Sequence, residues 1–183
     1  MPKVRKAKKS ARGGEYSCVA CTEKIVKGQE YYEWSFFRQR PRRQHTSHGM
    51  PKRSQLTQSN MSEAYAAEEG LAADIEAANT IDDIKTALST CRDSIESVKE
   101  QYESGYDAMP QGLQDSDAGQ ESQRKIEALD EYINALDNAE SDIEDFDEEE
   151  PDADSPEHQE WQDKHDAALE AAREKAQEPT LED

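Results

Sequence analysis

The chain has few of the residues that build a large hydrophobic core. Only 33% of its 183 residues are hydrophobic and 7% are aromatic, whereas 35% are charged. Such a composition cannot bury enough apolar surface for a single large domain, and it favours small units, long helices and solvated segments. The length is compatible with one domain or two small ones.

Long apolar runs are missing as well, and cysteine is scarce. No stretch approaches the length of a membrane-spanning helix, and the basic start is not followed by the apolar run of a signal peptide. The three cysteines form an odd set with one close pair, unlike the disulfide framework of a secreted protein. We therefore expect a soluble, intracellular protein of the cytoplasm, or of the host cytoplasm if the chain is viral.

The sequence also lacks the common catalytic patterns. It has no Ser-His-Asp order, no glycine loop that cradles a phosphate and no His-Glu-x-x-His helix. Cys91 lies on an apolar helix stripe without a positive neighbour, which is typical of a buried structural thiol. The many carboxylates lack the burial that would tune them for acid or base catalysis. We predict that the protein is not an enzyme.

Charge is divided unevenly along the chain. Residues 1–58 hold 14 Lys and Arg and 4 Asp and Glu, a formal charge of +10, whereas residues 59–183 hold 8 and 38, a charge of −30. A basic segment suits nucleic acid or another polyanion, which the acidic remainder repels. Residues 1–14 are too polar to bury themselves. We expect them to form a disordered basic arm that either binds a polyanion or only adds solubility.

The most specific pattern is a pair of cysteines followed by a pair of histidines. Cys18 and Cys21 are separated by two residues, and so are His45 and His48. Two thiolates and two imidazoles at these spacings can close a tetrahedral shell around one zinc ion. A closed shell is structural because it leaves no position for water. Zinc also supplies the folding energy that a unit of this size lacks.

Residues between the two pairs have the composition of a β-hairpin. The aromatic run Tyr31-Tyr32-Glu33-Trp34-Ser35-Phe36-Phe37 has strong β propensity. Basic side chains follow it and suit phosphate contacts, while the aromatic rings suit either stacking on unpaired bases or a small core. The predicted nucleic-acid contacts are Arg38, Arg40, Arg42, Arg43, Lys52 and Arg53.

This segment resembles a known zinc finger. Cys-x2-Cys, then Ile25 and Gly28, an aromatic hairpin and His-x2-ligand resemble the finger of the poly(ADP-ribose) polymerase type, and treble-clef knuckles are similar. The resemblance covers residues 15–50 and implies binding to DNA ends or distorted DNA through the backbone and through stacking. His48 stands where that family usually has cysteine. The first three ligands implied by the resemblance are Cys18, Cys21 and His45.

Two apolar stripes with heptad spacing follow the finger. The first consists of Ile81, Ile84, Leu88, Cys91, Ile95, Val98 and Tyr102, and the second of Ile126, Leu129, Ile133, Leu136 and Ile143. Steps of three and four residues place each set on one helix face, and Glu140 interrupts the second set between Leu136 and Ile143. Thr80 with Asp83 forms a capping-box pattern before the first helix, and Asp117 with Gln120 can cap the second. Pairing the stripes buries both.

We therefore predict a mainly α protein, in which a small zinc-stapled β-hairpin finger precedes an antiparallel, coiled-coil-like helical hairpin. The expected segments are a basic arm at 1–14, a zinc-finger module at 15–58, an acidic helical region at 61–146 and an acidic tail with a terminal helix at 147–183. A small finger before acidic helices also resembles uncharacterised phage proteins.

The predicted function is a nucleic-acid-binding adaptor, with DNA as the expected nucleic acid. Its acidic helices would contact a protein partner or a second copy of the chain, and no membrane is involved. The alternative is an acidic DNA mimic that occupies a nucleic-acid-binding protein of a host, with zinc as a purely structural clip.

Overall fold

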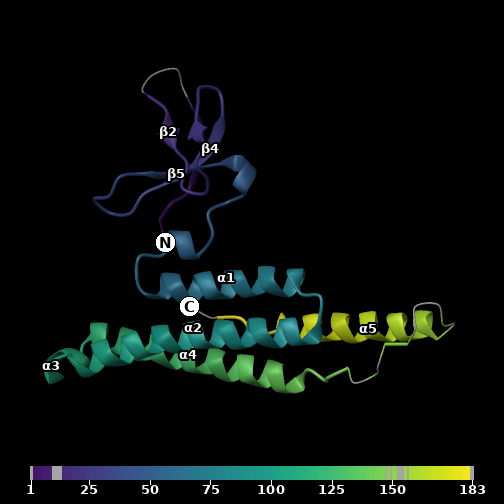
Figure 1. Cartoon of the computed structure of the whole chain (residues 1–183). Helices are drawn as coiled ribbons and strands as arrows, with labels where there is room; N and C mark the ends of the chain where they lie inside the picture. Colours follow the sequence, from purple (N-terminus) through teal and green to yellow (C-terminus); the bar gives the residue numbers. More distant parts are fainter. Residues whose placement is uncertain are drawn as a thin grey trace. The chain divides into compact units, whose positions relative to one another are not determined.

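The chain divides into two units, Met1–Ser62 and Glu63–Asp183, which we call unit 1 and unit 2. A computed structural model describes residues 2–9, 14–146, 148, 150–151, 155 and 157–181. Unit 1 contains short strands and unit 2 is helical (Figure 1). The predicted class, a mainly α chain that begins with a small β unit, is confirmed.

Unit 1 is organised around a three-stranded antiparallel sheet. Its elements are β1 (Arg5–Lys8), β2 (Tyr16–Ser17), β3 (Lys24–Ile25), β4 (Glu30–Trp34), β5 (Arg42–His45) and the 3-10 helices η1 (Thr46–His48) and η2 (Ser54–Leu56). The central strand β4 lies between β1 and β5, and β2 pairs with β3 in a second, two-stranded ladder. The first four residues of the aromatic run, Tyr31 to Trp34, therefore lie in the middle of the sheet, as their β propensity predicts.

The core of unit 1 is very small. Cys18, Ile25 and Tyr31 are buried together, and Cys21 packs against them. Trp34 is 1% exposed, and its indole N–H donates a 3.2 Å hydrogen bond to the carbonyl oxygen of Gln55. Because both cysteines belong to this core, whatever holds the two thiols also holds the fold of the unit.

Strand β1 corrects the expectation of a disordered arm. It pairs with β4, with Arg5 opposite Glu33. The Arg5 guanidinium donates to the Glu33 carboxylate, and Lys6 Nζ lies 2.8 Å from a carboxylate oxygen of Glu30. Residues 5–8 of the arm are ordered as a strand because β4 supplies the acidic partners and the strand edge that the cationic segment lacks alone. Residues 10–13 of the predicted arm lie outside the described residues.

Unit 2 is built on a long helical hairpin. Its elements are α1 (Met61–Ala77), α2 (Ile81–Asp107), α3 (Gln111–Gln114), α4 (Asp117–Asp142) and α5 (His158–Ala176). Helices α2 and α4 lie side by side and make the most extensive contact between elements of the unit (Figure 1). The predicted stripes face each other, since Leu88, Ile95, Leu129 and Leu136 are all below 2% exposed.

Helix starts agree with the sequence in one case and differ in the other. The Thr80 side chain accepts a hydrogen bond from the Asp83 N–H, and the Asp83 carboxylate accepts one from the Thr80 N–H, which confirms the capping box of α2. Helix α4 begins at Asp117, but its N-cap is Ser116, whose side chain makes no capping bond. The predicted cap by Asp117 is therefore wrong by one residue.

Three cations of α2 form a ladder of ion pairs with carboxylates on α4 and just after it. The cations are seven positions apart, so they recur on one face of the helix beside the apolar seam. We call this set the ladder. Its pairs are Lys85 with Asp145, Arg92 with Asp137 and Glu140, and Lys99 with Asp130.

The terminal helix expected in the acidic tail is α5, and it belongs to the helical unit. It contacts both α2 and α4 and buries Leu169, Ala172 and Ala176. The Arg173 guanidinium donates a 2.7 Å hydrogen bond to the carbonyl oxygen of Ala78. The helix docks because its small residues allow close packing. Of the predicted acidic tail at 147–183, residues 147, 149, 152–154, 156 and 182–183 lie outside the described residues.

Candidate metal centre

The two cysteines and two histidines lie on separate elements that the fold brings together. Cys18 follows β2 and Cys21 lies in the turn before β3, whereas His45 ends β5 and His48 ends η1. A 2.9 Å hydrogen bond from the Val19 N–H to the carbonyl oxygen of Arg43 joins the cysteine turn to β5. The predicted quartet is therefore assembled from two segments of backbone that are distant in sequence.

Ligand atoms of the quartet have the separations that one ion requires. One donor atom from each residue lies within 4.8 Å of every other. Cys21 Sγ is 3.7 Å from His45 Nδ1 and 3.3 Å from His48 Nε2. A tetrahedral zinc with metal–sulfur and metal–nitrogen bonds of about 2.3 and 2.0 Å places sulfur and nitrogen about 3.5 Å apart. The two distances bracket that value, so the four side chains can bind a metal ion.

Burial differs across the quartet. Cys18 and His45 are each 8% exposed, Cys21 is half-buried, and His48 is exposed. Because His45 turns Nδ1 toward Cys21, the other ring nitrogen, Nε2, faces away; it is buried without a hydrogen-bond partner among the described residues. A metal on Nδ1 would leave the proton on Nε2. The quartet thus has a buried side and a side open to solvent at His48.

The electrostatics of the cysteine pair favour a bound cation. Burial raises the pKa of Cys18, but hydrogen bonds from the backbone N–H groups of His45 and Ala20 outweigh it and lower that pKa to about 6. The pKa of Cys21 is raised, because burial and the neighbouring Cys18 thiolate both disfavour a second negative charge. A metal ion removes this conflict by neutralising both thiolates.

The predicted nucleic-acid contacts fall into two groups. Arg38, Arg40, Arg42 and Lys52 are exposed; the first two lie on the connection between β4 and β5, and Arg42 begins β5. Arg53 is half-buried. Arg43 is also half-buried, and its guanidinium is held by the Glu33 carboxylate at 2.6 Å and by the Tyr16 ring, 3.9 Å from the ring centre. Arg43 therefore stabilises unit 1, and its guanidinium is not free to contact a phosphate as the exposed cations are.

Glu33 is a structural residue that the sequence analysis missed. It is 7% exposed and receives hydrogen bonds from both Arg5 on β1 and Arg43 on β5. Burial raises the pKa of this carboxyl, but the two guanidinium groups outweigh it and lower the pKa below its usual range. A lone acidic residue within a basic aromatic segment was the available signal. Glu33 thus links β4 to both β1 and β5, and β5 carries His45.

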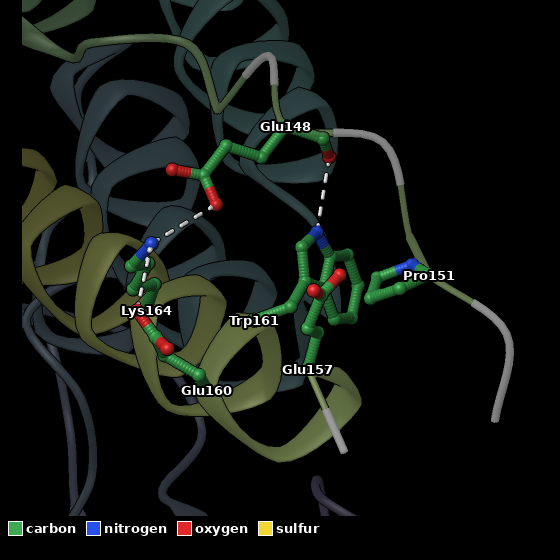
Figure 2. A pocket seen from close by; sticks show the side chains of 6 residues that line it. All are labelled: Glu148, Pro151, Glu157, Glu160, Trp161 and Lys164. Atoms are coloured by element: carbon green, nitrogen blue, oxygen red, sulfur yellow. Dashed lines mark hydrogen bonds and ion pairs between the residues drawn. The ribbon is translucent and has the colours of Figure 1, made fainter. Parts of the chain in front are cut away.

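The two remaining histidines do not join the quartet. His165 and His158 stack on the Trp161 ring, with ring centres 5.1 and 6.1 Å away. Figure 2 shows the Trp161 indole N–H donating to the carbonyl oxygen of Glu148 and Lys164 lying between two carboxylates. The cavity there has a volume of about 310 Å³ and is lined by Glu148, Pro151, Glu157, Glu160, Trp161 and Lys164.

Comparison with known proteins adds no relative. The chain matches no protein-family model, no curated protein and no solved structure. None of the described helices combines the length and the apolar character that crossing a membrane requires. The candidate metal centre therefore rests on the geometry of its own four side chains.

Proposed function

We propose that the chain is a non-enzymatic nucleic-acid-binding adaptor whose finger is held by zinc. Two thiolates and two imidazoles are the ligand set that zinc takes in closed, four-coordinate structural sites. Four protein ligands leave no open position for a reacting water, which supports a structural ion. In this proposal the metal holds β5 and the cysteine turn together and thereby fixes the surface that precedes His45.

The observation that carries the proposal is the turn between β4 and β5. Phe37 is 85% exposed, and the Arg38 guanidinium lies 4.9 Å from its ring centre. Arg42 lies similarly over Phe36, at 5.3 Å. Arg38 has a backbone φ of 59°, a left-handed conformation that is unusual for a residue with a side chain and is often found at functional sites.

This combination suits nucleic acid. Guanidinium groups neutralise phosphates, and an exposed ring can stack on an unpaired or terminal base at about 1–3 kcal/mol per base. The order of a cysteine turn, a β-hairpin and a second ligand pair also resembles the poly(ADP-ribose) polymerase finger. That resemblance supports DNA ends or distorted DNA over a base-sequence-specific duplex site, because stacking requires an accessible base face.

Fluorescence anisotropy with labelled single-stranded DNA and a blunt duplex tests the proposal. The double variant Arg38→Ala/Arg42→Ala should bind more weakly, and the slope of log affinity against log salt should become shallower by about one per arginine. Lys27→Ala, an exposed cation on the other turn, is the matched control and should change both quantities less. Unchanged affinity and slope in the double variant would refute the proposed surface.

One observation favours a second candidate function, the acidic DNA mimic. Unit 2 uses its cations internally: ion pairs or hydrogen bonds hold Lys85, Arg92, Lys99, Lys125, Lys164, Arg173 and Lys175. Exposed carboxylates therefore dominate its surface, as phosphates dominate a duplex. A chain that ignores labelled DNA, yet displaces it from a basic DNA-binding protein in a salt-dependent way, would support this candidate over the first.

A further inference from the structure

Burial of the helical hairpin changes along its length. The seam is buried on α2 as far as Val98 and on α4 from Leu129 onward. Beyond these points, toward α3, the large apolar side chains are only half-buried, and Leu113 is 53% exposed. We call these residues the distal face; they are Tyr102, Tyr106, Met109, Leu113 and Ile126.

The change has a structural cause. Helix α5 contacts α2 and α4, and Figure 1 shows the α3 end of the hairpin extending beyond both α1 and α5. Among the described residues of unit 2, that end is formed by α2, α4 and the short α3. Two helices bury a narrow stripe, so side chains at the edge of the stripe keep part of their apolar surface in water.

The distal face runs continuously across the hairpin. The ladder pairs Lys99 with Asp130, so the next positions of the seam bring Tyr102 close to the α4 stretch around Ile126. Lys125 of that stretch lies over the Tyr102 ring, 5.7 Å from its centre, which shows the two helices in contact there. The hydroxyl of Tyr102 is buried without a hydrogen-bond partner among the described residues.

Charges around the distal face are mostly negative. The exposed carboxylates at this end are Glu100, Glu103, Asp107, Asp115, Asp117 and Glu121. The cations there are Lys125, which pairs with Glu121 at 3.0 Å, Lys99, which lies 3.8 Å from Glu103, and Arg124. An apolar stripe with an acidic rim complements a segment that has apolar anchors flanked by Lys and Arg.

We propose that the distal face docks a basic amphipathic helix of a partner protein. The partner would insert apolar residues at i, i+3 or i+4, and i+7 between the helices and place its cations on the carboxylate rim. A second copy of unit 2 fits less well, because residues 59–183 carry a formal charge of −30 and two such surfaces repel each other. This deepens the partner-binding half of the proposed adaptor and depends neither on DNA nor on the metal.

The test uses the full chain and a labelled synthetic peptide with leucine and lysine in an amphipathic helical pattern. Two control peptides have the same composition in scrambled order, or glutamate in place of lysine. Anisotropy should show binding of the patterned basic peptide, weaker binding of the scrambled one and none of the acidic one. Equal binding of patterned and scrambled peptides would overturn the proposal, because it would show charge attraction without a docking face.

Substitutions at the distal face separate apolar docking from charge. Leu113→Glu and Met109→Glu add the same charge as Asn138→Glu, an exposed position further along α4. Burial of one such side chain corresponds to a change in affinity of about tenfold or more. The first two variants should therefore bind at least about tenfold more weakly, and Asn138→Glu should bind as the parent does. Loss of binding in all three, or in none, would overturn the proposal.

Two further measurements distinguish failure of the docking proposal from failure of the proposed zinc and DNA function. Peptide binding should persist with a chelator present, because the distal face belongs to unit 2 and the quartet of Cys and His belongs to unit 1. Light scattering of the chain without peptide should report monomers over the concentrations used. A concentration-dependent dimer that Leu113→Glu abolishes would assign the face to self-association and overturn the proposal.

Discussion

Removal of the metal should unfold unit 1 and leave unit 2 folded. The largest buried side chains around the core of unit 1 are Ile25, Tyr31 and Trp34. Each contributes about 1.5–3 kcal/mol by burial, roughly 5–9 kcal/mol together. Zinc binding in Cys/His finger peptides contributes about 10–16 kcal/mol. The metal term is the larger one, and Cys18 in the core and Cys21 packed against it both belong to the quartet that can bind the ion.

The two tryptophans make this prediction measurable unit by unit. Trp34 is buried in unit 1 and Trp161 lies on α5 of unit 2. In a Trp161→Phe variant only Trp34 emits, so a red shift on adding chelator reports unfolding of unit 1. Far-UV circular dichroism should retain the helical signal, since no other Cys/His quartet is found among the residues that the structure describes.

A matched pair of thiol variants checks the cause. Cys18→Ser should lose the metal without chelator, whereas Cys91→Ser, on the buried face of α2, should keep it. Native mass spectrometry reports the metal content in each case. The reasoning fails if the metal is absent by mass and Trp34 still emits as a buried indole, because the small core would then suffice alone.

Three further predictions concern stability. Glu33→Gln should lower the free energy of unfolding of unit 1 by about 1.5–3 kcal/mol in chemical denaturation at neutral pH. Because the pKa of Glu33 is lowered in the fold, its contribution is present above about pH 4.3 and is lost as the pH falls through the folded value, so the gap to the variant should close in acid. Thr80→Ala should remove about 1 kcal/mol from unit 2 through loss of the α2 cap, seen as a lower helical melting temperature. Gly119→Ala should cost about 1–3 kcal/mol in the same melt, because the new Cβ would meet the Gln114 carbonyl oxygen at 2.1 Å, and an undiminished melting temperature would show that α3 yields freely.

Local patterns in the sequence predicted the elements that depend on local physics. The capping box at Thr80 and the seam from Ile81 to Val98 follow from spacing within one helix, and both are confirmed. The quartet was predictable for the same reason, since each ligand pair is a short local spacing and the ion requires both pairs. Its members come together as predicted.

Features that depend on register between distant segments were not predictable. Arg43 was interpreted as a phosphate contact, because nothing in its neighbourhood shows that β5 places it beside Glu33. Strand β1 was missed because Arg5 and Lys6 find their carboxylate partners only across the sheet. The docking of α5 was missed because Ala172 and Ala176 give a weak hydrophobic signal although both are buried.

The ladder matters more for fixing the alignment of α2 against α4 than for the free energy that its ion pairs contribute. Its cations are about one quarter exposed, and pairs of that kind contribute only about 0.2–1 kcal/mol each. A shift of α4 by one turn would put Ser141 in the place of Asp137 opposite Arg92 and Asn134 in the place of Asp130 opposite Lys99, so each cation would lose one carboxylate partner. Apolar side chains along a helix seam can pack again after a shift by one turn, whereas the specific ion pairs cannot re-form. High salt, which screens the ion pairs of the ladder, should therefore leave the hairpin nearly as stable. It should also allow shifted alignments of α2 and α4 to form more often during folding.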